Sequence, residues 1–417
     1  MPNFSRARPG ESRCAMNYTR QEVMQFVREE DVKFIRLAFC DVYGKQKNIS
    51  IQPGELERAF ENGIAFDASS IAGFGDELRS DLFLRPEEDT LTVLPWRPEH
   101  GRVVRMFCDI TRPDGTPFEG DARQFLKRAV REAEEEGFTF RFGSELEFYL
   151  FELDERGKPT RIPYDEAGYM DIAPEDRGEN IRREICLTLE QMGITPESSH
   201  HEGGPGQNEI DFRHAGALAA ADNAVTFCGV VRTIAGRNGI AADFSPKPLP
   251  GQPGNGMHIN FSVRGRGDQH DMISAIAGVL ENISAMTAFL NPLEQSYERL
   301  GSHKAPRYIS WSAENRSPLI RIPAAFGEQK RAELRSPDGC ANPYIAYALL
   351  IYAGLDGIRR HLELPPAANI NFYTASPELL SAFRRLPATL EEARAVAGES
   401  EFIRAHVPEI IRRAYTA

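Results

Sequence analysis

The segment RFGSELEFYLF, residues 141–151, alternates large apolar side chains with glutamates. In a β-strand successive side chains point to opposite faces, so Glu145 and Glu147 share one face while Leu146 and Phe148 share the other. Burying ionised carboxylates is costly unless cations or hydrogen-bond donors compensate them. The segment therefore predicts a strand that packs one face on the core and turns the other towards a charged site.

The same alternation occurs in the segments QNEIDFR, GMHINFSV, RAELRS and LIRIP. Each places apolar residues at alternate positions, with carboxylates, a histidine or arginines between them. For any single strand a face open to solvent is the simpler explanation, because antiparallel sheets commonly have one wetted face. A solvated face would normally carry Lys, Thr, Gln and Ser, however. Together the segments favour one curved sheet whose concave face is an active site.

The chain has 417 residues and a formal net charge of -12. This length suits two domains better than one. The acidic balance argues against nucleic acid or an anionic membrane surface as the main partner, although clustered arginines can still bind an anionic substrate. The six cysteines form no CxxC pair, so they predict neither a zinc site nor a disulfide framework and fit reduced thiols in the cytoplasm.

Residues 1–15 are polar and rich in Pro, Arg and Ser, which predicts a disordered extension. They lack the apolar stretch of a signal peptide, and Met16 is an alternative start to Met1. The apolar run that includes SAMTAFLNP is interrupted by Glu281 and Asn282, which predicts a segment too short to span a bilayer. We therefore expect a soluble protein located in the cytoplasm.

Turn-forming residues in TRPDGTPFEGD divide the chain into two parts. The first part alternates a short helix with strand-like runs, and the second opens with a helix predicted over 122–136. Asp121 suits the N-cap of that helix, and Gly137 suits its end. We therefore predict a first domain over 16–112 and a second over 113–417.

Acidic residues and one histidine on the polar faces and nearby loops are candidate metal ligands. They are Glu145, Glu147, Glu202, Glu209, His258 and Glu333. Oxygen-rich ligands without cysteine suit Mg²⁺ or Mn²⁺, and converging carboxylates repel one another without such cations. Two metal ions with three protein ligands each is the economical interpretation. The doublet His200–His201 lacks HExxH or HxxxH spacing, so we favour a structural or supporting role for it.

The same faces and nearby loops carry candidate cationic groups for anion binding. They are Arg299, Arg316, Arg321, Arg331 and Arg335. Guanidinium groups bind phosphate and carboxylate oxygens in a bidentate manner. Two divalent metals with an arginine cluster suit phosphoryl transfer, in which catalysis is mostly positioning and charge neutralisation. No Walker A motif and no dinucleotide fingerprint is present, so any ATP is held in another way.

Six motifs occur along the chain: FDASSIAGF, GSELEF, HHEGGPGQNEI, GNGMHI, NRSPLIRIP and RAELRSPDGCANPYIAYALLIYAGLDGI. Together they resemble the glutamine synthetase family of the bacterial type I class, in its shorter, non-adenylylated form, and the resemblance covers about residues 18–415. It implies an α+β fold, with an N-terminal β-grasp domain and a catalytic domain. The catalytic domain would be a curved antiparallel sheet with surrounding helices, similar to guanido kinases.

The resemblance also implies a homo-oligomer, a dodecamer of two stacked hexameric rings with active sites between neighbouring subunits. The implied substrates are L-glutamate, ATP and ammonium, with two Mg²⁺ or Mn²⁺ ions per site. In the implied reaction the γ-carboxylate of glutamate attacks ATP to give γ-glutamyl phosphate. Ammonia then displaces the phosphate to give glutamine.

By position, the resemblance assigns Glu147, Glu202 and Glu209 to the metal nearer glutamate. It assigns Glu145, His258 and Glu333 to the metal that bridges the ATP phosphates. The remaining groups follow in the same way. Arg316, Arg321 and Arg331 would contact the phosphates, Glu197 and Ser262 the nucleotide, Gly254, Arg299 and Arg335 the glutamate, Asp67 the ammonium and its proton, and Ser70 and Tyr169 the nearby ammonium pocket.

The loop RLGSHKAP departs from the family pattern. The family usually carries a glutamate directly before Ala-Pro, which helps to accept the ammonium proton, whereas this chain has Lys304. A cation there would repel ammonium, unless the shorter loop after Arg299 points Lys304 away from the site. Pro253 and Asn260 also replace an asparagine and a histidine that are common in the family.

These differences leave two alternatives to glutamine synthesis. Some members of the superfamily join glutamate to methylamine, ethanolamine or polyamines, so the acceptor here could be an organic primary amine or polyamine. A non-catalytic structural or regulatory homologue is the second alternative, although such relics usually lose metal ligands first.

Overall fold

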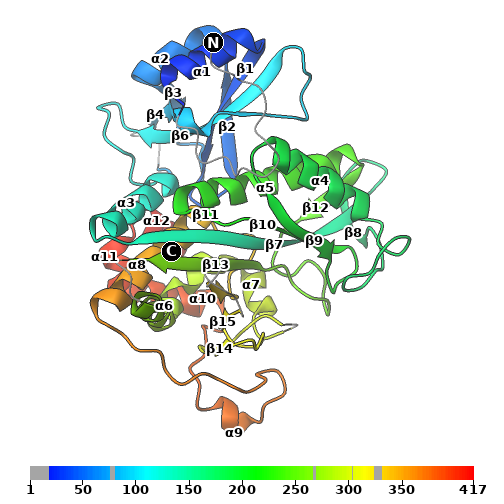
Figure 1. Cartoon of the computed structure of the whole chain (residues 1–417), viewed down its shortest axis with the longest axis vertical. Helices are drawn as coiled ribbons and strands as arrows, with labels where there is room; N and C mark the ends of the chain where they lie inside the picture. Colours follow the sequence, from blue (N-terminus) through cyan, green and yellow to red (C-terminus); the bar gives the residue numbers. More distant parts are fainter. Residues whose placement is uncertain (1–17, 76–79, 266–268, 303, 324–330) are drawn as a thin grey trace.

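The computed structural model describes residues 18–75, 80–265, 269–302, 304–323 and 331–417 (Figure 1). The extension expected over 1–15, and the alternative start at Met16, lie outside these residues. The described residues form two β-sheets with helices packed on both, as the alternating segments and intervening helical patterns predict.

The first sheet has the strand order β2-β1-β6-β4-β3, with β5 paired to β6, and appears at the top of Figure 1. Strand β1 runs antiparallel to β2 and parallel to β6. Helices α1 and α2 bury Val23, Val27 and Phe60 against this sheet. The bounds are α1 Arg20–Glu29, β1 Val32–Cys40, β2 Gln46–Ile51, α2 Leu56–Asn62, β3 Ile64–Asp67, β4 Asp81–Pro86, β5 Thr92–Val93 and β6 Arg102–Thr111, with 3₁₀ turns at Pro53–Glu55 and Glu88–Thr90.

The second sheet is built around the long strand β7, which crosses the middle of Figure 1. Its order is β14-β15-β16-β13-β7-β10-β9, and β8, β11 and β12 also pair with β7. All pairs are antiparallel except β14 with β15. The bounds are β7 Thr139–Leu153, β8 Pro159–Pro163, β9 Pro196–His201, β10 Gln207–Phe212, β11 Ala215–Gly216, β12 Ile240–Asp243, β13 Met257–Arg264, β14 Trp311–Ala313, β15 Ile320–Ile322 and β16 Ala332–Leu334.

Helices cover the apolar face of this sheet. Phe142 of β7 stacks on Tyr347 with 4.4 Å between ring centroids, and Phe148 lies 6.2 Å from Phe227. The predicted helix after Asp121 is confirmed, with the Asp121 side chain accepting a hydrogen bond from the amide of Arg123. The bounds are α3 Ala122–Glu135, α4 Glu179–Gln191, α5 Ala217–Arg237, α6 Gln269–Leu290, α7 Glu294–Arg299, α8 Pro343–Arg359, α9 Pro377–Leu380, α10 Leu390–Glu399, α11 Glu401–His406 and α12 Glu409–Thr416.

Helix α6 corrects one expectation from the sequence. Glu281 and Asn282 do not interrupt it, so the apolar run is longer than predicted. Among the described residues, Ala217–Arg237 and His270–Leu290 are long and apolar enough to cross a membrane by length and composition alone. Within their most apolar windows, 56% and 78% of the residues are buried inside the protein. Packing in the core therefore accounts for their apolar character.

The two sheets are joined by buried polar contacts. Arg123 of α3 forms ion pairs with Glu87 at 2.6 Å, Asp109 at 3.3 Å and Asp222 at 3.0 Å. These carboxylates come from both parts of the chain. The Asn342 side chain, which caps α8, also donates a hydrogen bond to the Val42 carbonyl at 3.0 Å. The first sheet is thereby held in a fixed position relative to the second.

Candidate active site

The alternation predicted for residues 141–151 is confirmed in β7. Leu146 and Phe148 are fully buried on the helix-covered face, whereas Glu145 and Glu147 lie on the other. Strand pairing brings partners beside both glutamates: His258 and Asp211 are in register with Glu145, and Glu209 is in register with Glu147. Cross-strand neighbours in an antiparallel pair are close enough for their side chains to interact. The polar face of β7 is therefore the centre of the site.

Glu145, His258 and Glu333 form the first group that could hold a metal ion. Their ligand atoms all lie within 4.8 Å of one another. The Nδ1 atom of His258 is 3.4 Å from Glu145 Oε2 and 3.8 Å from Glu333 Oε1. This nitrogen is buried and has no hydrogen-bond partner among the described residues. An unsatisfied buried nitrogen between two carboxylates fits a cation ligand better than a purely structural side chain.

The second group contains Glu202 and Glu209, with His200 beside them. His200 Nε2 lies 3.6 Å from Glu209 Oε1, and His200 Nδ1 lies 4.0 Å from Glu202 Oε1. Glu147 is not among these converging atoms, because its Oε2 accepts a hydrogen bond from the Gly256 amide at 2.7 Å. It is nevertheless near, since its charge raises the pKa of both Glu202 and Glu209.

His200 and Asp211 join the site although sequence reasoning did not select them as ligands. Asp211 lies within 4.8 Å of Glu145 and Glu209 by ligand atoms. The sequence pattern could have identified both residues, because alternation along a strand places His200 on the same face as Glu202 and Asp211 on the same face as Glu209. His201 instead points into the protein, where its Nε2 lies 2.8 Å from Asp165 Oδ1 and its Nδ1 lies 2.7 Å from the Glu202 carbonyl oxygen.

The crowded carboxylates perturb one another. Burial, together with the charge of Glu147 and its neighbours, raises the pKa of Glu209 to about 11. Burial and the charge of Glu145 raise the pKa of Asp211 to about 6. Burial opposes ionisation of Glu145, but the adjacent His258 ring and the Asn260 amide outweigh it and lower the pKa of Glu145 to about 2. Burial and converging negative charge thus favour the protonated form of Glu209, whereas a divalent cation would favour the ionised form.

Arginines surround the same groups. Glu333 is almost fully buried and accepts hydrogen bonds from Arg321 at 2.8 Å and from Arg335. The Nε of Arg331 donates to the Asn260 side-chain oxygen at 2.8 Å. Arg316, by contrast, is exposed. Of the arginines expected at the phosphates, Arg321 therefore contacts a metal-capable carboxylate directly, and Arg331 reaches Glu145 through Asn260.

The residues expected at the nucleotide line one cavity. Glu197, Ser262 and Arg331 surround a volume of about 250 Å³, together with Glu145 and Asn260. The cavity lies next to the first metal-capable group, because Glu145 belongs to both.

The residues expected at glutamate form a second cluster. Arg299 is buried and donates to the carbonyl oxygens of Ser336 at 2.7 Å and Arg335 at 3.3 Å. Gly254 lies against Arg299: a Cβ at this position would come within 2.2 Å of the Pro246 carbonyl oxygen and 2.9 Å of Arg299 Cγ. Only glycine allows this approach.

Asp67 and Ser70 are not near these groups within one chain. Both are exposed: Asp67 is the last residue of β3, and Ser70 lies three residues after it. Strand β3 belongs to the first sheet, at the top of Figure 1. The Asp67 carboxylate accepts hydrogen bonds from the Ser69 hydroxyl at 2.7 Å and the Ser69 amide at 2.9 Å, and these bonds lower its pKa. Asp67 is therefore an ionised carboxylate presented at the surface.

Lys304 points into the site. Its Nζ lies 4.8 Å from the centroid of the Tyr169 ring, and that ring meets His200 edge to face with 5.5 Å between centroids. The charge of Lys304 also lowers the pKa of Glu202, against the stronger raising effect of burial. Of the two orientations that the sequence left open, the structure has the one in which the lysine lies over Tyr169 and near Glu202.

Sequence comparisons identify the family. The profile described as "Glutamine synthetase, catalytic domain" matches residues 119–417, and the profile "Glutamine synthetase, beta-Grasp domain" matches residues 31–113. The chain belongs to the glutamine synthetase family. It is 46% identical over 416 residues to a glutamine synthetase of Clostridium saccharobutylicum, covering 96% of this chain and 94% of that protein. It is 45% identical over 403 residues to one from Staphylococcus aureus strain Mu50, covering 93% and 90%.

Solved structures agree with this glutamine synthetase fold. A GmaS in complex with ADP superimposes with a TM-score of 0.86 at 27% identity, covering 94% of this chain and 93% of that one. The Plasmodium falciparum glutamine synthetase superimposes with a TM-score of 0.83 at 22% identity, covering 95% and 94%. The expected β-grasp domain followed by a catalytic domain with a curved sheet is confirmed.

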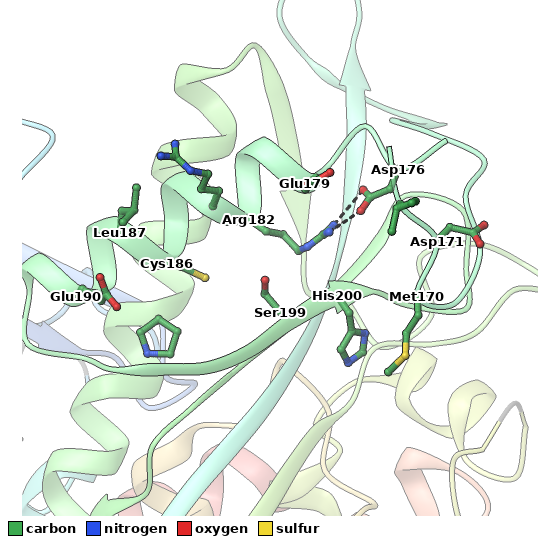
Figure 2. A pocket seen from close by; sticks show the side chains of 13 residues that line it. Met170, Asp171, Asp176, Glu179, Arg182, Cys186, Leu187, Glu190, Ser199 and His200 are labelled. Atoms are coloured by element: carbon green, nitrogen blue, oxygen red, sulfur yellow. Dashed lines mark hydrogen bonds and ion pairs between the residues drawn. The ribbon is translucent and has the colours of Figure 1, made fainter. Parts of the chain in front are cut away.

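A further cavity in this glutamine synthetase family member lies beside the site, between α4 and β9 (Figure 2). It measures about 510 Å³ and is lined by His200, Met170 and Cys186, among others. Arg182 pairs with both oxygens of Asp176 at its edge, at 3.1 Å and 2.5 Å. His200 is therefore the residue shared by this cavity and the second metal-capable group.

Proposed function

We propose that the protein joins ammonia to the γ-carboxylate of L-glutamate at the expense of ATP, giving glutamine, ADP and phosphate. One observation carries this proposal: metal-capable carboxylates and phosphate-binding arginines converge on one sheet face in a chain that is 46% identical to a glutamine synthetase. Phosphate release measured with ATP, glutamate and Mg²⁺ tests it, with ammonium and a panel of primary amines offered separately. Strong turnover with ammonium supports the proposal, and none with any acceptor overturns it.

We assign two divalent metal sites, for Mg²⁺ or Mn²⁺. Glu145, His258 and Glu333 would hold one ion, and Glu147, Glu202 and Glu209 the other. The unpartnered His258 nitrogen and the raised pKa of Glu209 support this fit, because a divalent cation would satisfy the nitrogen and stabilise the ionised carboxylate. Such ions, when bound, would neutralise charge on the phosphate oxygens.

Metal binding should release a proton. Since the pKa of Glu209 is about 11 without cations, this carboxyl is protonated at neutral pH and must lose its proton to act as a ligand. Mn²⁺ titration in weakly buffered solution at pH 7.5 should therefore release about one proton per chain from this position. Glu209→Gln should remove that proton. Metal binding with no proton release in the unaltered protein would contradict the assignment.

The same shift predicts a pH dependence of metal-free stability. The folded chain keeps a proton on Glu209 that the unfolded chain loses above the ordinary glutamate pKa. The contribution of Glu209 to the stability of the metal-free protein is therefore fully present below the pKa of glutamate in the unfolded chain. It is lost as the pH rises towards about 11, the pKa of Glu209 in the folded chain.

The remaining residues position the two substrates. Arg316, Arg321 and Arg331 would bind the phosphates, and Glu197 and Ser262 the nucleotide. Arg299, Arg335 and the main chain of Gly254, which no side chain covers, would bind glutamate. A γ-carboxylate oxygen then attacks the γ-phosphorus, and ADP leaves with the electrons of the broken P–O bond. Asp67 then takes the proton that ammonium must lose, and the ammonia formed attacks the acyl carbon of γ-glutamyl phosphate. Phosphate leaves with the electrons of the broken C–O bond and takes up the second proton that the nitrogen releases.

Asp67 can take this role only if it comes from another subunit. We propose a homo-oligomer, a dodecamer of two hexameric rings, in which the first domain of one chain completes the site of the next. Its surface position in the isolated chain supports this arrangement. Ser70 and Tyr169 would line the ammonium pocket from the two sides. We further propose domain limits of 16–112 and 113–417 and a cytoplasmic location.

An organic primary amine or polyamine as acceptor is the second candidate, and Lys304 is the observation that favours it. Its ammonium group faces Tyr169, so it competes for the position that a substrate cation needs. A non-catalytic structural homologue is the third candidate, and absence of both turnover and metal binding would support it.

Lys304→Glu should strengthen the use of ammonium. Replacing a repelling cation with an attracting carboxylate should lower the KM for ammonium by about tenfold, since tenfold corresponds to about 1.4 kcal/mol of interaction. Initial rates against ammonium concentration, at fixed ATP and glutamate, measure this. Lys158→Glu, an exposed charge reversal in the β7–β8 turn, is the matched control and should change nothing. An unchanged KM in Lys304→Glu would place the lysine outside the ammonium pocket.

A further inference from the structure

The Asn260 side chain lies between Glu145, a proposed metal ligand, and Arg331, a proposed phosphate-binding residue. Its side-chain nitrogen donates a hydrogen bond to Glu145 Oε1 at 2.8 Å, and its side-chain oxygen accepts one from Arg331 Nε at 2.8 Å. The residue is 7% exposed and lies on β13, on the same face as His258. It therefore connects a metal-capable carboxylate directly to an arginine of the neighbouring cavity.

The orientation of this amide is determined by its two partners. A carboxylate can only accept hydrogen bonds, and a guanidinium can only donate them. If the amide were turned over, oxygen would face oxygen and N–H would face N–H, so both bonds would become repulsive contacts. An amide satisfies both neighbours at once without carrying a charge of its own.

Each partner depends on this contact for its position. Within the described part of the chain, the bond to Asn260 is the only side-chain hydrogen bond that Arg331 makes. On the other side, Asn260 occupies Oε1 of Glu145, while Oε2 faces His258 at 3.4 Å. The amide thus fixes which carboxylate oxygen turns towards the metal-capable group. It also fixes where the guanidinium enters the cavity.

We propose that Asn260 is a positioning residue, which holds Glu145 and Arg331 at a fixed separation so that one polyphosphate meets both the bound cation and the guanidinium. This role rests on the proposed function, because it concerns the same nucleotide site. Because hydrogen bonds to charged groups are among the stronger ones, losing this link should weaken nucleotide binding by about ten- to a hundredfold.

A double-mutant cycle on ADP binding tests this, measured by calorimetry with saturating Mn²⁺ so that no turnover is needed. Asn260→Leu should weaken ADP binding by about tenfold or more. In an Arg331→Met background the same change should cost only about twofold, because the arginine that it positions is already gone. A purely structural role would give the same factor in both backgrounds.

Asn260→Asp is a second, independent test. For this substitution the loss of Arg331 should make the effect on ADP binding larger, whereas for Asn260→Leu it should make the effect smaller. Aspartate still accepts a hydrogen bond from Arg331 but repels Glu145. Its repulsion is offset by Arg331 in the unaltered background and is not offset in Arg331→Met. The Asp substitution should therefore weaken ADP binding more in Arg331→Met than in the parent, whereas the Leu substitution should weaken it less. Circular dichroism establishes that each variant is folded.

Asn238→Leu is the matched control. Its amide also donates to a glutamate, Glu184, at 3.0 Å, but it lies at the end of α5 away from the cavity. ADP binding should be unchanged in this variant. Equal factors for Asn260→Leu in both backgrounds would overturn the positioning role while leaving the proposed function intact. Failure of the unaltered protein to bind ADP with Mn²⁺ would overturn both.

Discussion

Glu333→Ala is expected to abolish glutamine formation. The Glu333 carboxylate is 1% exposed, accepts hydrogen bonds from Arg321 and Arg335, and faces His258. Its removal leaves two guanidinium groups without their counter-charge, which costs about 3–5 kcal/mol for a buried pair. It also removes one ligand of the proposed phosphate-side metal. Losing several kcal/mol of charge stabilisation corresponds to a fall in kcat of about a thousandfold or more.

The measurement is glutamine formation together with Mn²⁺ stoichiometry by electron paramagnetic resonance. The variant should bind one ion fewer per chain, and circular dichroism should show that it remains folded. Glu333→Gln keeps the shape of the side chain, so it separates loss of charge from loss of packing. Glu132→Ala breaks an exposed ion pair with Arg359 instead and should be active. Near-normal turnover of Glu333→Ala would refute the metal assignment.

Asp67→Ala should lower turnover by about 10²–10⁴-fold, the usual contribution of a positioned base. A more specific prediction concerns assemblies that contain both the Asp67→Ala and the Glu333→Ala variants. Asp67→Ala and Glu333→Ala are each inactive for a different reason, and the proposed site takes these two residues from different chains. Dissociating the two variants together and reassembling them should therefore restore activity. With equal amounts and random assembly, about a quarter of the sites would contain both intact residues.

Native mass spectrometry should show that the recovered activity accompanies mixed assemblies. Each variant taken alone through the same dissociation and reassembly is the control and should stay inactive. Mixed assemblies without activity would show that Asp67 and Glu333 serve the same chain, and full activity of Asp67→Ala alone would show that Asp67 has no part in the reaction.

The strand alternation predicted much of the site because a period of two assigns every residue to a face. Glu145, Glu209, His258 and Glu333 could be placed on one sheet face in this way, and the structure gathers their ligand atoms into two groups that share Glu145. The period does not decide which members of a face converge. Glu147 lies on the expected face, yet its Oε2 accepts a hydrogen bond from the Gly256 amide, a contact that depends on strand register.

Other parts of the site depend on loops and on other chains. The direction of Lys304 is set by the loop after Arg299, in which Lys304 itself has a positive φ of 70°. No periodic pattern encodes that conformation, so the sequence left two orientations open. The link made by Asn260 requires Arg331 to approach from the position just before the neighbouring strand β16. The role of Asp67 rests on an assembly, and therefore came from family resemblance alone.

Transfer of a labelled oxygen tests the central claim most directly. Glutamate carrying ¹⁸O in its γ-carboxylate is incubated with ATP, Mg²⁺ and ammonium, and the phosphate and glutamine formed are analysed by mass spectrometry. If the γ-carboxylate attacks ATP and ammonia then displaces phosphate, each phosphate released should carry one oxygen from glutamate, in step with one glutamine formed. Unlabelled phosphate would contradict the account, because ATP would then have been hydrolysed without activating glutamate.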